Sequence, residues 1–243
     1  MRRRTFLLSA ASTAPLANAQ APPTKMLVGE APPYAYGAAD GEAAGAAFEL
    51  VADAARRLAI AFIYELEPMA RAVMMAQRAG PVLLFPTARL PSRNSLFQWV
   101  APLVPMRLML FAKRDSPVDI RSLVSARRLK LGVLSSGGMR EYCESLGLAS
   151  IQPVSSNTRA VKMLLADRFD AVLTADHAVR AAIQELGMPP GVLREGAVVM
   201  DAHLWIAASL AFRADEIDRW RKGFAEQGAD GTRKRVLERY RII

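Results

Sequence analysis

The chain has 243 residues, of which 52% are hydrophobic and 23% are charged, and its formal net charge is +9. This is the composition of an ordinary globular protein with enough apolar surface for a full core, which excludes an intrinsically disordered chain. No stretch approaches the roughly 18 uninterrupted apolar residues that span a bilayer, so we expect no transmembrane helix. The single cysteine, Cys143, excludes an intrachain disulfide, and we expect it to be a small buried residue.

The N-terminal segment is typical of a secretory signal peptide. Three arginines precede a moderately apolar stretch from Phe6, and an Ala-Asn-Ala tripeptide ending at Ala19 fits a cleavage site with small residues. Arg3 and Arg4 also fit a twin-arginine pattern, so the Sec and twin-arginine export routes both stay open. We assign residues 1–19 as a signal peptide cleaved after Ala19 and expect the mature protein in the periplasm. The alternative is a cytosolic protein with a basic N-terminus.

Cleavage removes three arginines and no acid, so the formal net charge falls from +9 to +6. Several of the remaining cations crowd the C-terminal segment: Arg233, Lys234, Arg235, Arg239 and Arg241. No aromatic residues interleave with them as a base-stacking surface requires, and exported proteins rarely meet nucleic acid. We therefore predict a solvated helix face and no nucleic-acid partner.

Strand-like apolar runs alternate with helical periodicity in the first part of the mature chain. We predict strands at residues 25–29, 61–66 and 81–85, and helices from about residue 48 and over 69–79. That alternation is typical of a parallel α/β sheet.

The alternation restarts after a central apolar stretch at residues 102–113. We predict strands at 129–134, 151–154 and 170–175, and helices from 139 and over 158–166. The segments that begin at Arg71 and Arg159 both start Arg-Ala-Val and pass from a helix to an apolar strand. Unless this echo is chance, the chain builds two similar α/β lobes, in which strand 82–85 is equivalent to strand 171–174.

Motifs of the common enzyme classes do not occur in this sequence. There is no GxSxG, HExxH, P-loop or GxGxxG pattern, and one cysteine with two histidines, His177 and His203, offers no recognisable zinc set. We expect both histidines to be structural and the protein to need no cofactor or metal.

Candidate ligand-binding residues follow the two equivalent strands, because ligands of open α/β sheets lie beyond the carboxyl ends of strands. Thr87, Arg89 and Arg93 follow the first, and Thr174 and Asp176 follow the second. A guanidinium binds a carboxylate bidentately, and only one of the two arginines needs to point inward. The alternatives are a pair of solvated arginines and an aspartate that caps its helix instead of accepting a ligand ammonium.

Two further segments fit a small polar ligand. Ser136, Gly137 and Gly138 lie between a predicted strand and a predicted helix, where free backbone N–H groups attract an anion. Glu30 ends the first strand, and the prolines after it hold Tyr34 at the edge of the expected cleft. A plain capped turn and a surface turn explain the same residues.

In order and spacing, these segments resemble type II periplasmic solute-binding proteins, specifically the polar-amino-acid group that serves ABC importers. The resemblance runs from about residue 25 to 240 and rests on segments such as "VGEAPPYAY", "ARLPSRNSLFQWVAPLV", "LKLGVLSSGGMREY" and "DAVLTADHAV". It implies that Arg93 grips a ligand α-carboxylate and that Asp176 takes the α-ammonium. It also implies that the turn at Ser136 to Gly138 adds carboxylate donors, and Arg89 lies where many members also have arginine.

Three positions depart from the pattern of that group. Ala88 replaces a hydroxyl residue beside the carboxylate, Met69 replaces a frequent tryptophan, and Asp176 follows Asp170 by six residues where the closest pattern has five. These departures leave another small carboxylate or an unusual amine open as the ligand.

The resemblance implies a two-lobed α/β fold in which each lobe is a mainly parallel sheet flanked by helices. We predict lobe 1 from residues 24–104 and 203–243 and lobe 2 from residues 105–202. Two crossings, near Val104 to Arg107 and Met200 to His203, would form a hinge that closes on the ligand. The closed monomer would then be recognised by an inner-membrane ABC permease, and the protein would not be an enzyme.

Two other functions fit the same fold. One is a periplasmic lyase or dehydratase, in which Glu30 or Asp176 serves as the general acid or base. The other is an orphan sensor that presents its ligand to a membrane receptor.

Overall fold

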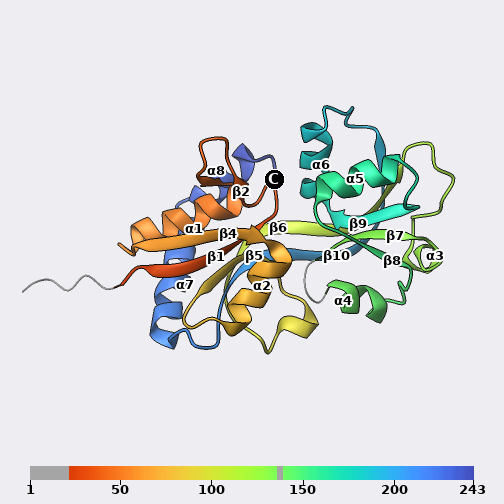
Figure 1. The fold of residues 1–243 in the computed structure, drawn as a ribbon. Coiled ribbons are helices and arrows are strands. Elements are labelled where there is room, and N and C mark those ends of the chain that lie inside the picture. Colours follow the sequence, from red (N-terminus) through yellow and green to blue (C-terminus); the bar gives the residue numbers. More distant parts are fainter. Residues whose placement is uncertain (1–21, 136–138) are drawn as a thin grey trace, which may run out of the picture.

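The computed structural model describes residues 22–135 and 139–243 (Figure 1). Its strands are β1 (Thr24–Glu30), β2 (Tyr36–Gly37), β3 (Ala43–Ala44), β4 (Phe62–Pro68), β5 (Leu83–Ala88), β6 (Gln98–Lys113), β7 (Leu131–Leu134), β8 (Ile151–Val154), β9 (Ala171–Ala175) and β10 (Leu193–Ala208). Its helices are α1 (Ala46–Arg57), α2 (Met69–Arg78), the 3-10 turn η1 (Pro91–Arg93), α3 (Leu123–Ala126), α4 (Met139–Ser145), α5 (Asn157–Leu165), α6 (Asp176–Glu185), α7 (Ala214–Ala229) and α8 (Thr232–Arg239). The predicted strands and helices are confirmed, with β5 running three residues further than predicted.

The main sheet has eight strands in the order β4-β1-β5-β10-β6-β9-β7-β8. Strands pair in parallel within β4-β1-β5 and within β9-β7-β8, whereas β6 and β10 pair antiparallel with each other and with β9 and β5. This order is symmetric about the β10–β6 pair and places β5 opposite β9. The two similar halves predicted from the internal echo are therefore present.

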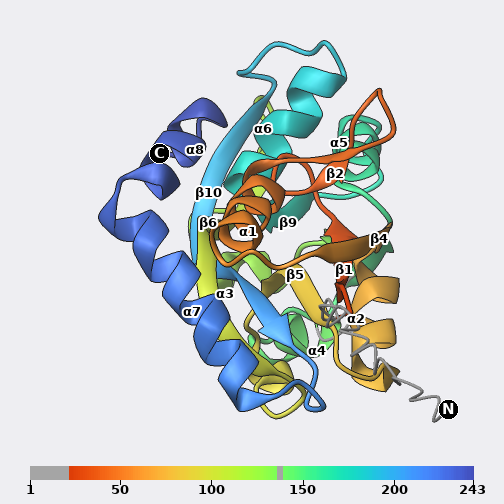
Figure 2. The ribbon, with the colours of Figure 1, turned by 90° about the vertical axis from the view of Figure 1, so that its left-hand side faces the viewer.

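Helices cover both faces of the sheet in the first half because successive strand residues point to opposite sides. Met26 and Val28 of β1 pack in one apolar cluster with Leu50 of α1 and Phe224 of α7. Leu27, between them, packs on the other face with α2. Figure 2 shows the same division, with α7 and α2 on opposite sides of the strands.

The second half is layered in the same way. Leu173 of β9 joins the cluster that includes Met139 and Cys143 of α4, and its neighbour Val172 packs with Val161 of α5 on the other face. Cys143 is fully buried, which confirms the prediction that this single cysteine is a small buried residue.

The two 16-residue strands β6 and β10 run from one half of the molecule to the other (Figure 1). We call the half with β1, β4, β5, α1, α2, α7 and α8 the first lobe, and the half with β7–β9 and α3–α6 the second lobe. The predicted crossings lie side by side, since Pro105 pairs with His203 and Arg107 with Asp201. The residue bounds of the lobes stay a prediction. Within the described residues, no helix combines the length and hydropathy that crossing a bilayer requires.

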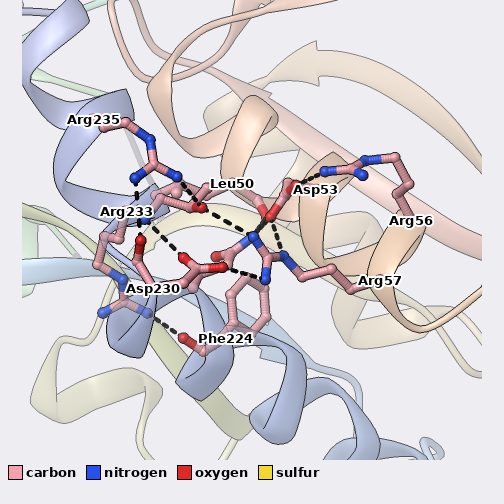
Figure 3. Close-up of polar contacts among 10 residues, drawn as sticks. Leu50, Asp53, Arg56, Arg57, Phe224, Asp230, Arg233 and Arg235 are labelled. Atoms are coloured by element: carbon pink, nitrogen blue, oxygen red, sulfur yellow. Dashed lines mark hydrogen bonds and ion pairs between the residues drawn. The ribbon is translucent and has the colours of Figure 1, made fainter.

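The C-terminal helices are tied to α1 by a polar network (Figure 3). Arg57 of α1 donates from Nε to Asp53 Oδ2 and from Nη1 to Asp230 Oδ2, both at 2.6 Å. Gln227 of α7 donates from Nε2 to the Leu50 carbonyl at 2.7 Å. Of the clustered C-terminal cations, four are exposed, as predicted, and Arg233 is partly buried.

Candidate ligand-binding site

A cavity of about 80 Å³ lies where the carboxyl ends of β5 and β9 meet, between the two lobes. Both lobes contribute to its wall. The lining residues are Ala31, Tyr34, Met69, Pro86, Ala88 and Arg93 from the first lobe, Met106 and Leu108 from β6, Leu204 from β10, and Leu134, Met139, Asn157, Leu173, Thr174, Ala175 and Ala178 from the second lobe. The location agrees with the rule that ligands lie beyond strand ends in α/β sheets.

Arg93 is the cationic residue of this wall. The turn η1 begins at Pro91, whose fixed φ suits the start of a helical turn, and the Arg93 N–H donates to the Leu90 carbonyl at 2.9 Å. The side chain folds inward, and the residue is only 2% exposed. Its Nη1 donates to Thr87 Oγ1 at 2.9 Å and to the Ala88 carbonyl at 3.1 Å.

Burial lowers the pKa of the Arg93 guanidinium to about 10, and the negative charge of Glu141 opposes that shift. The guanidinium therefore keeps its positive charge at neutral pH. A buried cation beside a cavity attracts an anion, because burial weakens the competition from water for the same donors.

Arg89 points to a different surface. It is exposed, donates from Nε to Asn94 Oδ1 at 3.0 Å, and lies 5.4 Å and 5.3 Å from the ring centroids of Trp99 and Trp205. These are cation–π distances. Only one arginine of the loop therefore reaches the cavity, and the sequence had not indicated the two tryptophans that hold the other.

Tyr34 is a second polar residue of the cavity wall. Its carbonyl accepts from the Ala47 N–H at 2.8 Å, and a Cβ at Gly45 would lie only 2.5 Å from that carbonyl oxygen, so glycine is required there. The residue is 2% exposed, and its hydroxyl has no hydrogen-bond partner among the described residues. Burial first, and the charge of Asp176 second, raise the pKa of this phenol far above its ordinary value. Tyr34 therefore stays protonated and can donate to a ligand.

Asp176 lies beside the cavity but does not line it. It is the first residue of α6, after Ala175, and is 1% exposed. Its Oδ2 accepts from Arg107 Nε at 3.1 Å, and its Oδ1 accepts from the backbone N–H groups of Arg107 at 3.3 Å and His177 at 2.9 Å. Sequence reasoning missed the partnership of Arg107 with Asp176, although a charge in the middle of the apolar stretch at 102–113 was the available signal.

Two other predicted residues, Thr87 and Glu30, are not in the wall of the cavity. Thr87 is fully buried within β5, behind Arg93. Glu30 is exposed and lines a wider groove of about 820 Å³ next to the cavity, together with Ser135 and Arg159. Ser136, Gly137 and Gly138 lie outside the described residues.

The rest of the wall is mostly apolar. The sequence interpretation named Thr174 as a candidate and Ala88 and Met69 as departures from the pattern, and it did not name the other residues. Met106 and Leu108 alternate along β6, as one face of a strand requires. Thr174 donates from Oγ1 to Asn157 Oδ1 at 2.6 Å, so the amide oxygen of that asparagine already accepts one hydrogen bond. The cavity is thus an apolar chamber with a guanidinium and a phenol in its wall.

No family model and no curated protein matches the chain. Many solved structures share its fold at low sequence identity, among them a sensor domain and two amino-acid-binding proteins. A histidine kinase sensor domain with similarity to periplasmic binding proteins has a TM-score of 0.80 and 20% identity, covering 90% of this chain and 95% of that chain. The arginine-, lysine-, histidine-binding protein ArtJ from Geobacillus stearothermophilus has a TM-score of 0.74 and 14% identity, covering 90% of this chain and 95% of that chain. The ancestral amino-acid-binding protein AncCDT-1, a precursor of cyclohexadienyl dehydratase, has a TM-score of 0.72 and 17% identity, covering 89% of this chain and 94% of that chain.

At these identities the likeness establishes the fold. The chain has the two-lobed α/β fold of type II periplasmic binding proteins, as the resemblance in the sequence predicted.

Proposed function

We propose that this chain, with the fold of periplasmic binding proteins, is an exported protein that captures a small carboxylate between its lobes. In this proposal the closed form delivers the ligand to an inner-membrane ABC permease. The observation that carries the proposal is the position of Arg93, which is 2% exposed and lies in the wall of the cavity between the lobes.

A carboxylate is the natural counterpart of this guanidinium. The planar fork of arginine matches two carboxylate oxygens, and hydrogen bonds to charged groups are worth about 1.5–3 kcal/mol each when water is excluded. The bonds from Arg93 to Thr87 and Ala88 hold the guanidinium against the sheet before a ligand arrives. A preorganised donor loses less conformational entropy on binding.

Closure of the lobes is the second part of the proposal. Wall residues come from both lobes, and β6 and β10 are the strands that join the lobes. Bending of this antiparallel pair would open and close the cavity in the manner of a hinge. The solved relatives ArtJ and AncCDT-1 are an amino-acid-binding protein and an ancestral one, which supports a small-molecule ligand here.

A sensor role is the second candidate, because a histidine kinase sensor domain shares the fold with a TM-score of 0.80. The same capture of ligand would then signal to a membrane receptor instead of feeding a permease. The lyase alternative has less support: the cavity wall, within the described residues, carries neither a carboxylate nor a histidine to act as general base.

The direct test is a thermal-shift screen of the purified protein against amino acids, other small carboxylates and amines. A ligand at one hundred times its dissociation constant adds about 2.7 kcal/mol of stability. For a chain of this size that raises the melting temperature by roughly 5–10 °C. We expect such a rise with at least one carboxylate. A response to amines alone, or to no carboxylate in the panel, would contradict the proposal.

A further inference from the structure

The chain places no acidic side chain in the cavity wall. All 23 aspartates and glutamates lie within the described residues, because residues 1–21 contain no acid and residues 136–138 are Ser-Gly-Gly. None of those acids lines the cavity. An ammonium group that enters the cavity therefore meets no carboxylate in its wall, and an ammonium buried without an anionic partner is strongly disfavoured.

Asp176 is the acidic residue next to the cavity wall that could serve as a partner for a ligand ammonium. Its charge is already paired with that of Arg107. The carboxylate accepts three hydrogen bonds, two of them from Arg107, and its side chain is 2% exposed against 43% for that of Arg107. The arginine thus lies on the solvent side of the pair. A ligand ammonium would therefore compete with Arg107 for a carboxylate that is already paired.

Two polar residues of the cavity wall, Arg93 and Tyr34, can donate hydrogen bonds. Arg93 contributes a guanidinium, and the buried Tyr34 hydroxyl has no partner among the described residues. Thr174 uses its hydroxyl proton on the Asn157 amide oxygen, so that proton is not available to a ligand and the oxygen already accepts one hydrogen bond. Donors of this kind fit a carboxylate and a second oxygen beside it.

The remaining wall and the volume limit the body of the ligand. Thioether and aliphatic side chains surround the space, among them Met69, Met106, Leu108 and Leu204. The volume of about 80 Å³ is smaller than the ~150 Å³ of an apolar cavity that binds benzene. A short apolar chain therefore fits better than a long polar one.

We propose that the cavity selects a small carboxylate that has a short apolar body and no ammonium on its α-carbon, such as a 2-oxo or 2-hydroxy acid. The inference rests on the proposed function, because it specifies which carboxylate the Arg93 site accepts. Arg93 would bind the carboxylate, and the Tyr34 hydroxyl would donate to the neighbouring oxygen.

Matched ligands with one carbon skeleton test the inference in the full chain by titration calorimetry. The pairs are pyruvate and lactate against L-alanine, and 3-methyl-2-oxobutanoate against L-valine. We expect the 2-oxo or 2-hydroxy acid to bind at least tenfold more tightly than its amino acid. Equal or tighter binding of the amino acid would overturn the inference while leaving carboxylate capture intact. If no carboxylate of any kind binds, the proposed function itself fails.

Variants of the Arg107–Asp176 ion pair give an independent test. Asp176→Asn removes the charge with little change of shape, and we expect the affinity for the 2-oxo acid to stay within twofold. A tenfold or greater loss would show that Asp176 serves the ligand and would overturn the inference. Should that variant fail to fold, Arg107→Gln decides. This substitution leaves the Asp176 carboxylate without its cationic partner, so we expect the ratio of the amino-acid Kd to the 2-oxo-acid Kd to fall at least threefold. An unchanged preference would contradict the role assigned to Arg107.

Discussion

Arg93 donates a hydrogen bond from Nη1 to Thr87 Oγ1 at 2.9 Å, and both residues are buried. Thr87 lies inside β5 and pairs with Trp205 of β10, so its position is fixed by the sheet. The hydroxyl therefore anchors the guanidinium of the cavity wall to a rigid strand. This relationship makes Thr87 a positioning residue that acts through Arg93.

Thr87→Val keeps the shape of the side chain but removes the acceptor of the Arg93 hydrogen bond. Because a hydrogen bond to a charged group contributes about 1.5–3 kcal/mol, we expect the free energy of unfolding to fall by about 1–3 kcal/mol. A looser guanidinium should also weaken carboxylate binding several-fold. Urea unfolding and calorimetric titration measure the two effects. Thr24→Val, at the start of β1 and away from the cavity, serves as the matched control, and equal effects of the two variants would contradict the positioning role.

Asp230 links α8 to α1 and makes part of the stability depend on pH. Hydrogen bonds from Thr232, and then from Arg57, lower the pKa of Asp230 to about 2. A carboxylate with a depressed pKa in the folded state stabilises the protein fully above its unfolded pKa of about 4. That contribution is lost as the pH falls from about 4 to about 2. We expect Asp230→Asn to flatten the fall in unfolding free energy across this window, and urea titrations from pH 6 to pH 2 measure it. Parallel profiles for the two proteins would contradict the assignment.

Cys143 should be chemically inert in the folded protein. It is fully buried in the core, and burial, with a smaller effect from Glu144, raises the pKa of its thiol to about 11. The thiolate is the reactive form, so little of it exists at neutral pH. We expect a thiol reagent such as dithiobisnitrobenzoate to label the folded protein at least a hundredfold more slowly than the urea-unfolded protein. Similar rates in both states would show that α4 opens readily.

The order of strands and helices was predictable because the spacing of apolar residues and the length of each apolar segment distinguish strands from helices. The internal echo from Arg71 and Arg159 also located the equivalent strands β5 and β9. The pairing of the 16-residue strands β6 and β10 was harder to predict from the sequence, since it joins residues about a hundred positions apart. No local pattern encodes such a contact.

The candidate site was predictable only in part for a similar reason. Arg93 and Tyr34 lie in the cavity wall as expected from their places near strand ends, but periodicity could not tell which of two neighbouring arginines folds inward. That choice depends on Trp99 and Trp205, which stack with Arg89 from two strands distant in sequence. The pairing of Arg107 with Asp176 is likewise a tertiary contact, and it changes what the aspartate can do.

Titration of the Arg93→Ala and Arg89→Ala variants, using the carboxylate that most raises the melting temperature, tests the central claim most directly. The two substitutions remove the same group from the same loop, but only the Arg93 guanidinium lines the cavity. We predict that Arg93→Ala weakens binding at least tenfold with little loss of folding, and that Arg89→Ala changes the affinity less than twofold. Unchanged affinity in Arg93→Ala, or an equal loss in both variants, would contradict the account.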